Sequence, residues 1–239
     1  MPTIPEYSVV IPTLNEEVNI QNLITDLQKQ TFQPKEIIIV DGGSTDNTRK
    51  IIKLIPNICL YNKKPNIGQQ RNTGWQKSVS DIVVFLDADT RCSPTFIKDS
   101  LNDFTEKELD IACPIYDPIT KDRRIKKIYQ FFNGLFYLAQ WVLPSGAGSC
   151  IVATKKILRH TDGFKEDYTY DDIYFIRKAA HFGKFRILST KIHVSPRRFE
   201  KYGIWQTLTT YILLSFCFIF GAYNLADKIS YPFGTYSKH

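Results

Sequence analysis

Apolar runs alternate with helical segments through the first part of the chain. The runs, in order, are SVVIP, EIIIVD, ICLYN and DIVVFLD, and each ends in polar or turn-forming residues. Between them, residues 15–30, 48–55 and 67–79 are predicted to be helices. Uninterrupted apolar runs are typical of strands covered on both faces, so the pattern predicts an α/β fold with a mostly parallel, Rossmann-like sheet flanked by helices.

The pattern is less regular beyond residue 90. Helices are expected over residues 94–104 and within 160–183, and strands over 110–117 and 151–155. Residues 203–226 contain no charged side chain and predict an apolar C-terminal helix. At ~1.5 Å per residue this segment is long enough for a ~30 Å hydrocarbon layer, although its Gln, Thr and Asn side chains weaken that signal.

A second apolar segment, residues 129–143, is too short to cross a bilayer. Arg123, Arg124, Lys126 and Lys127 precede it. Cations followed by large aromatic side chains are typical of an interfacial helix on an anionic membrane surface. The alternative for both apolar segments is burial, either within the domain or in a homodimer contact.

Composition and charge limit the class of protein, its partners and its cellular compartment. The chain has 239 residues, 43% hydrophobic and 23% charged, which suits one globular domain with an appendage. The net charge of +7 favours an anionic partner. Nucleic acid is not expected, because the basic run leads into an apolar helix and not into a stacking sheet. Five widely spaced cysteines without a C-x-x-C pair fit reduced thiols in the cytosol, and the N-terminus has no signal-peptide pattern.

Two aspartates, Asp87 and Asp89, end the apolar run VVFLDADT. Carboxylates beside each other at the end of a buried strand repel, and a divalent cation that prefers hard oxygen ligands resolves this. Taken alone, the pair is also explained as a cap of the following turn. Residues 12–15 and Asp41 follow other strands, and ligands of such sheets bind beyond the carboxyl ends of the strands. We therefore expect a ligand and an Mg²⁺ or Mn²⁺ site at this edge.

Five sequence segments, each weak evidence when taken alone, are strong evidence together because they occur in a characteristic order. They are IPTLNEE, IIIVDGGSTDNT, NIGQQRNTGW, VVFLDADT and TDGFKEDYTYDDIYFIRKA. Together they resemble the family 2 glycosyltransferases, which have the GT-A fold, over residues 7–90 and again over 161–179. The resemblance implies an inverting, metal-dependent enzyme. It would transfer a sugar from a nucleoside-diphosphate sugar, with UDP favoured and GDP left open, to a hydroxyl or lipid-phosphate acceptor.

The resemblance also implies roles for individual residues. It places the nucleotide-sugar at Pro12, Thr13, Asn15, Glu16, Asp41, Arg71, Asp87, Ala88 and Asp89. The metal would be held by Asp89 and Asp87, with His193 as a third ligand. The general base would be Asp172, with Asp171 where the family has glutamate, and the choice between the two stays open.

Several of these residues also have a purely structural explanation. Asp41 precedes two glycines and is a common turn-former. Asp171 and Asp172 suit a helix N-terminus, while His193 fits a structural histidine near a strand end. Arg71 fits a surface cation or the partner of a carboxylate such as Asp41.

The predicted organisation has three parts. Residues 1–200 form the GT-A domain, with a nucleotide-sugar half at 1–110 and an acceptor half at 111–200, and residues 201–239 form the apolar C-terminal segment. The expected site of action is the cytoplasmic face of the cell membrane, on a lipid or glycan acceptor of the cell envelope. The alternative is an inactive nucleotide-sugar-binding or membrane scaffold protein of the same fold. A nucleotidyltransferase or dinucleotide oxidoreductase is disfavoured, because no glycine-rich phosphate loop follows the first strand.

Overall fold

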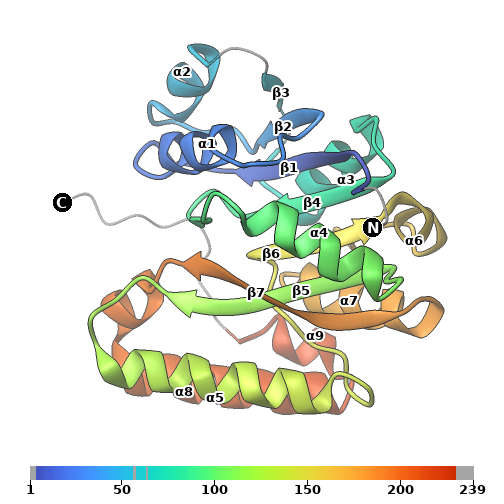
Figure 1. Ribbon diagram of the computed structural model, residues 1–239. Coiled ribbons are helices and arrows are strands. Elements are labelled where there is room, and N and C mark those ends of the chain that lie inside the picture. The colour runs from blue at the N-terminus through green and yellow to red at the C-terminus, as the bar shows by residue number, and fades with distance from the viewer. Residues whose placement is uncertain (1–3, 56–57, 63, 230–239) are drawn as a thin grey trace.

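A computed structural model describes residues 4–55, 58–62 and 64–229 of the protein. Strands and helices alternate along most of it, as the sequence predicts (Figure 1). The elements in chain order are β1 (Tyr7–Thr13), α1 (Ile20–Gln28), β2 (Glu36–Asp41), α2 (Thr48–Lys53), β3 (Ile58–Asn62), α3 (Ile67–Lys77), β4 (Ile82–Leu86), α4 (Phe96–Glu106), β5 (Ile111–Pro118), α5 (Arg123–Ala139), β6 (Cys150–Thr154), α6 (Lys155–His160), α7 (Asp171–Phe182), β7 (Phe185–Val194), α8 (Arg197–Ile219) and α9 (Tyr223–Ala226).

The strands form one mixed sheet in the order β3-β2-β1-β4-β6-β5-β7. All neighbouring pairs are parallel except those of β6, which runs antiparallel to β4 and to β5. The mostly parallel sheet flanked by helices is therefore confirmed. Because β1, β2 and β4 run in the same direction, the residues that follow them meet at one edge of the sheet.

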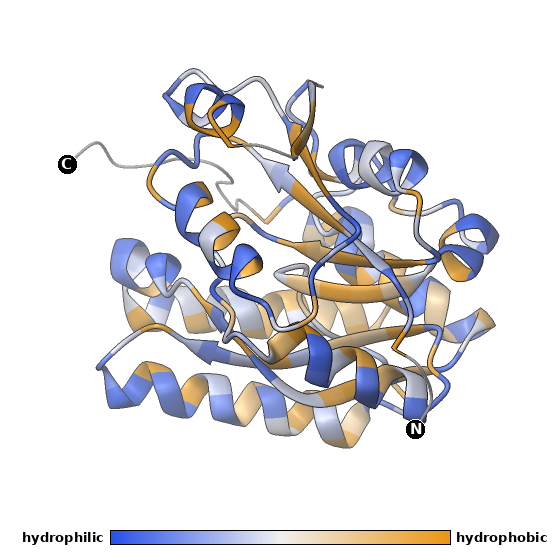
Figure 2. Cartoon of the chain, turned by 45° about the horizontal axis from the view of Figure 1, so that its top comes forward, coloured by the Kyte–Doolittle hydropathy of each residue, from blue (hydrophilic) through white to orange (hydrophobic). Residues whose placement is uncertain are grey.

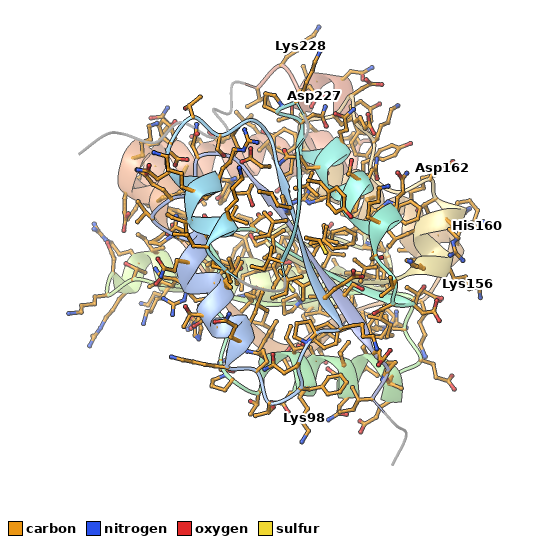
Figure 3. The ribbon with its side chains drawn as sticks, turned by 90° about the horizontal axis from the view of Figure 1, so that it is seen from above. Lys98, Lys156, His160, Asp162, Asp227 and Lys228 are labelled. Atoms are coloured by element: carbon orange, nitrogen blue, oxygen red, sulfur yellow. The ribbon has the colours of Figure 1, made fainter. Side chains whose placement is uncertain are left out.

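Burial on both faces explains why the strands are uninterrupted apolar runs. Every residue of β1 and of β4 is buried, and the helices pack on either side of the sheet (Figures 1 and 2). Helix α1 contributes Ile20, Leu23, Ile24 and Leu27 from one face to this core. Charged side chains such as Lys98 and Lys156 lie at the periphery in the view from above (Figure 3).

The first helix is shorter than predicted. The sequence predicts it over residues 15–30, whereas α1 begins at Ile20. Asn15 has a positive φ of 53°, which is not helical, and its side chain accepts a hydrogen bond from Thr45 N. The residues before α1 are thus held by the loop that follows β2.

Helices α5 and α8 lie side by side along one end of the sheet (Figure 1). Their aromatic side chains meet in the pairs Phe132–Tyr211 and Tyr129–Phe199, each with ring centroids 5.9 Å apart. Asn133 ties α5 to β5, because its side chain accepts a hydrogen bond from Tyr116 N and donates one to Tyr116 O. The basic and aromatic segment is therefore a helix, as predicted, and this helix, α5, packs between β5 and α8.

The apolar part of the C-terminal helix begins where predicted, after a break at Gly203, and ends at Ile219, before the predicted end at residue 226. Helix α8 begins at Arg197 and is broken at Gly203, whose φ of 77° is not helical. It is the one helix among the described residues that is long and apolar enough to cross a membrane, and 22% of its apolar window is buried. Its C-terminal half and α9 pack on Tyr170 and Ile173 through a small separate cluster. Residues 230–239 of the predicted C-terminal segment lie outside the described residues.

Candidate active site

Arg71 of α3 lies at the centre of the polar residues at the carboxyl edge. Its side chain is 2% exposed, and its Nη1 donates to both carboxylate oxygens of Asp171, each at 2.8 Å. Its Nη2 donates to Asp87 Oδ1 at 3.1 Å and to Gly148 O at 3.3 Å. Burial disfavours the charged guanidinium, but the adjacent carboxylates outweigh it and raise the pKa of Arg71.

The partners of Arg71 differ from the sequence-based expectation. It is neither a surface cation nor a partner of Asp41, because its guanidinium joins Asp87, at the end of β4, to Asp171, at the start of α7. These segments are far apart in the sequence. The arginine thus fixes the position of the predicted metal-binding segment relative to the predicted base.

Asp171 and Asp172 are adjacent but have different surroundings. Asp171 is buried against Arg71. Burial raises the pKa of the Asp171 carboxyl, and Arg71 limits that rise. Asp172 is half-buried, accepts hydrogen bonds from Gly148 N at 2.6 Å and Ile173 N at 2.8 Å, and lines a cavity. Of the two, Asp172 alone lines that cavity, and each carboxylate oxygen has a further lone pair for a ligand.

Asp89 has a cation beside it that the sequence analysis did not assign to the site. Arg197, the first residue of α8, places Nε 3.3 Å from Asp89 Oδ2 and Nη1 3.1 Å from Glu16 Oε1. Burial raises the pKa of Asp89 to about 6, while Arg197 opposes that rise. From the sequence, Arg197 and Arg198 fit either a phosphate contact or the flank of an apolar segment, and nothing in it indicates which carboxylates lie near them.

The loops after β1 and β2 form one hydrogen-bonded unit. Asp41 is fully buried, and its carboxylate accepts from Gly43 N at 3.1 Å and from Ser44 N at 3.0 Å. Asn15 N donates to Ser44 Oγ at 2.8 Å. Asp41 therefore organises its own turn, as its structural explanation requires. Pro12, Thr13 and Ala88 are also buried beside these loops.

His193, the predicted third metal ligand, contacts Asp117 and pairs through its backbone with Arg91, two residues after Asp89. Its Nδ1 is 3.1 Å from Asp117 Oδ2. Among residues 4–55, 58–62 and 64–229 there is no group of three or more His, Cys, Asp or Glu side chains arranged to hold a metal ion.

Asp87 and Asp89 are nevertheless a donor set that suits Mg²⁺ or Mn²⁺. Both provide hard carboxylate oxygens, and such ions often use one or two carboxylates together with water and substrate phosphates. The side chain of Asp89 is 13% exposed and already has the positive charge of Arg197 beside it. The two aspartates therefore fit the cation, and His193, whose Nε2 is not engaged by the contact of Nδ1 with Asp117, stays a predicted third ligand.

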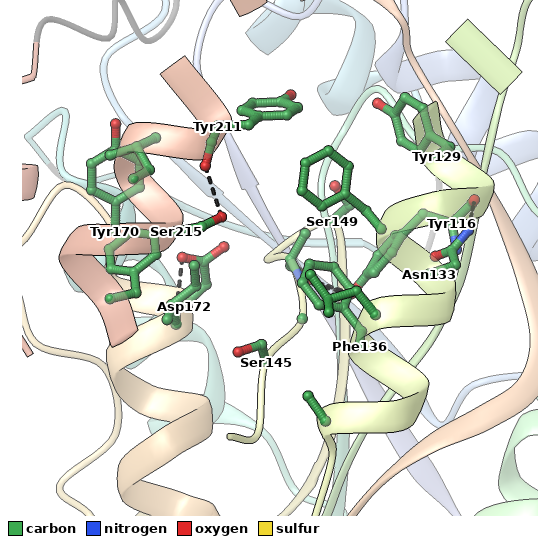
Figure 4. Close-up of a pocket in the computed structure, with 18 of the residues that line it drawn as sticks. Tyr116, Tyr129, Asn133, Phe136, Ser145, Ser149, Tyr170, Asp172, Tyr211 and Ser215 are labelled. Carbon is green, nitrogen blue, oxygen red and sulfur yellow. Dashed lines mark hydrogen bonds between the residues drawn. The ribbon is translucent and has the colours of Figure 1, made fainter. Parts of the chain in front are cut away.

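A cavity of about 290 Å³ lies beside this polar cluster. Figure 4 shows Asp172 on one side of it and Asn133 and Phe136 of α5 on the other, with Ser145 and Ser149 between them. Most of its lining side chains are apolar or aromatic, among them Tyr116, Tyr129, Phe132, Leu135, Phe136, Leu143, Ile173, Val194, Tyr211, Leu214, Phe218 and Ile219. Sequence reasoning did not find this cavity, because its walls come from α5, α7, α8 and the loop before β6.

Residues 8–192, more than half of the chain, match the family model described as Glycosyl transferase family 2. The glycosyltransferase AglE of Haloferax volcanii is 37% identical over 101 residues, which are 38% of this chain and 32% of AglE. The poly(ribitol-phosphate) β-N-acetylglucosaminyltransferase TarS of Staphylococcus aureus is 30% identical over 115 residues, 44% of this chain and 20% of TarS. The matched part is about a third or less of each of these relatives.

Solved structures show the same fold. S. aureus TarS in complex with UDP-GlcNAc superposes with a TM-score of 0.65 at 22% identity, over 80% of this chain and 58% of that one. The mannosyltransferase PcManGT from Pyrobaculum calidifontis, in complex with GDP-Man and Mn²⁺, gives 0.66 at 21% identity, over 80% and 57%. The sheet and its helices are therefore of the GT-A type.

Proposed function

The chain belongs to glycosyl transferase family 2, and from that premise we propose that it is an inverting, metal-dependent glycosyltransferase. It transfers a sugar from a nucleoside-diphosphate sugar to a hydroxyl or lipid-phosphate acceptor at the cytoplasmic face of the membrane. The structural neighbour TarS binds UDP-GlcNAc, which supports a UDP-sugar donor. The GDP-Man complex of PcManGT keeps GDP-sugars as the alternative.

One observation carries this proposal. Arg71 and the backbone of Gly148 join Asp87, in the predicted metal-binding segment, to Asp171 and Asp172, in the predicted catalytic segment. In addition, Asp87 N donates to Ser149 O at 3.1 Å. The donor side and the base side are thus one connected structure, as a single displacement at an anomeric carbon requires.

Different residues of the site have different roles in the sugar transfer. Asp172 accepts the proton of the acceptor hydroxyl as that oxygen attacks the anomeric carbon from the face opposite the leaving diphosphate. Arg71 and Asp171 orient this segment without touching the substrate. Asp89 and Asp87 would hold a divalent cation, which would neutralise negative charge on the departing nucleoside diphosphate.

Exposed apolar side chains on α5 and α8 support the membrane assignment. They recur at helical spacing on both helices and form what we call the α5–α8 apolar surface: Phe131, Leu135 and Leu138 of α5 with Trp205, Ile212, Phe216 and Ile219 of α8. A contiguous apolar surface on neighbouring helices is typical of a membrane or protein interaction site. The basic first turn of α5, with Arg123, Arg124 and Lys126, suits anionic headgroups.

Nucleotide release from a panel of UDP- and GDP-sugars, each with Mn²⁺ and with EDTA, tests the proposal. We expect one donor class to release nucleoside diphosphate only with the metal. Asp89→Ala should abolish metal-supported donor binding, whereas Asp99→Ala, an exposed aspartate on α4, should leave it intact. Asp172→Asn should keep donor binding and lower turnover by at least ~100-fold.

Two outcomes would refute these roles. Loss of donor binding in Asp172→Asn would show that this residue is not the base. Donor binding without turnover of any donor, in the presence of membrane extracts as acceptor source, would instead favour a non-catalytic nucleotide-sugar-binding protein of the same fold.

A further inference from the structure

We infer that the cavity between α5 and α8 binds the hydrocarbon tail of an amphipathic acceptor, and that the hydroxyl-bearing head of this acceptor lies against Asp172. The inference rests on the proposed function, since it takes Asp172 as the base. It identifies the class of acceptor as a lipid alcohol or glycolipid in preference to a soluble glycan.

The chemistry of the walls favours a hydrocarbon. At about 290 Å³ the cavity is close to the lower end of the ~300–1,000 Å³ that small-molecule pockets span. Phe132, Leu214 and Phe218 contribute apolar area from two helices, and a soluble sugar would leave its hydroxyls unpaired against them. A chain of methylene groups has no such cost.

The polar side of the cavity is the candidate active site itself. Asp172 lines the cavity, and so does Ser149, whose carbonyl oxygen accepts from Asp87 N. The loop of residues 145–149 therefore lies between the cavity, which it lines, and Asp87 of the predicted metal-binding segment. A hydroxyl at the Asp172 side is next to the place where the donor's diphosphate would lie.

The opposite side of the cavity reaches the molecular surface. Leu135 and Ile219 line the cavity and are 46% and 52% exposed, and both belong to the α5–α8 apolar surface. A lipid resting on that surface can therefore pass its tail between the two helices into a cavity whose lining is mostly apolar. This continuity between an exposed apolar surface, an apolar cavity and a carboxylate is what selects an amphipathic lipid as the occupant.

Binding of n-alkyl β-D-glucosides tests the inference without turnover. Butyl to octyl glucosides, kept below their micelle concentrations, are titrated into the full chain in a calorimeter. Each methylene that enters the cavity is worth ~0.8 kcal/mol, so the dissociation constant should fall about fourfold per added methylene. A dissociation constant that does not change with chain length would overturn the inference.

Variants localise the binding. Ser215 lines the cavity from α8, and Ser215→Leu should fill it and remove the dependence on chain length. Thr209→Leu adds comparable bulk at an exposed position of the same helix, away from the cavity, and should retain the dependence. Ala139→Leu fills the cavity from α5 and replaces Ser215→Leu as the test if that variant does not fold.

Two further readouts separate the inference from its alternatives. Binding of UDP with Mn²⁺ is measured on the same samples. If nucleotide binds but no glucoside does, the inference fails and the proposed function stands; if glucosides bind but no nucleotide does, the proposed function fails. Light scattering that shows a dimer, lost in Ser215→Leu, would identify a second copy of the chain as the occupant and overturn the inference.

Discussion

Removal of the Asp171 carboxylate should destabilise the protein far more than removal of the adjacent Asp172 carboxylate. Asp171→Ala leaves Arg71 buried without its bidentate partner, and breaking a buried ion pair costs about 3–5 kcal/mol. Asp87 still contacts Arg71 at 3.1 Å, so we expect the low end of that range, about 3 kcal/mol. For a chain of 239 residues this corresponds to a fall in Tm of about 6–12 °C. Asp172→Ala loses two backbone hydrogen bonds from a half-buried site and should cost about 1–2 kcal/mol.

Equilibrium unfolding in urea, followed by tryptophan fluorescence, measures both losses. The midpoint should shift while the slope m stays constant. The double variant Arg71→Met/Asp171→Ala should be more stable than Asp171→Ala alone, because the unpaired charge is then absent. Equal stability of Asp171→Ala and Asp172→Ala, or no recovery in the double variant, would contradict the buried pair. Retained donor-dependent activity in Asp172→Asn would separately contradict its assignment as the base.

Three further predictions concern the same site. A Cβ at Gly148 would collide with the Arg71 guanidinium and lie 2.9 Å from Asp172 Oδ2, so Gly148→Ala should lower Tm and, in a donor-turnover assay, activity by at least about tenfold. The pKa of Asp89 is raised to about 6, so its charged form destabilises the metal-free fold above pH 6 but not below pH 4. Asp89→Asn should therefore raise the free energy of unfolding by up to about 3 kcal/mol at pH 8 and leave it unchanged at pH 4. Thermal melts at the two pH values measure this difference. Arg197→Ala removes a partly exposed cation beside Asp89 and should strengthen binding of Mn²⁺ alone by up to about fivefold in calorimetry, whereas weaker binding would show that Arg197 supports the ion.

The sequence predicted the fold well because its strands are buried on both faces and appear as uninterrupted apolar runs. The same pattern placed Asp87, Asp89 and Asp41 at one edge, since parallel strands end together. The family resemblance placed Arg71 at this site, but sequence reasoning could not identify its partners, because an arginine within a polar helix resembles a surface cation until its burial is known. The sequence favoured Asp172 over Asp171 as the base but could not decide between them, whereas the structure places Asp171 against Arg71 and Asp172 on a cavity wall.

In the C-terminal third of the chain, sequence reasoning failed for a different reason. Its apolar residues predicted helices, but not the cavity between them, because each wall is contributed by a different element and has no local signature. The contact between Arg197 and Glu16 joins residues from opposite ends of the chain. The antiparallel direction of β6 was likewise not indicated, since an apolar run of five residues carries no information on strand direction.

The break at Gly203 divides α8 into a short first turn, which holds Arg197 at the carboxylates, and a long apolar rod. In a continuous helix, any change in the tilt of residues 204–219 would move Arg197 away from Asp89. The break at Gly203, where φ is 77°, separates the two parts of α8, and glycine adopts this backbone conformation without strain. The two parts can therefore change their relative orientation at this residue. Under the proposed membrane association, a change in the tilt of residues 204–219 would therefore disturb the contact of Arg197 with Asp89 less than it would in an unbroken helix.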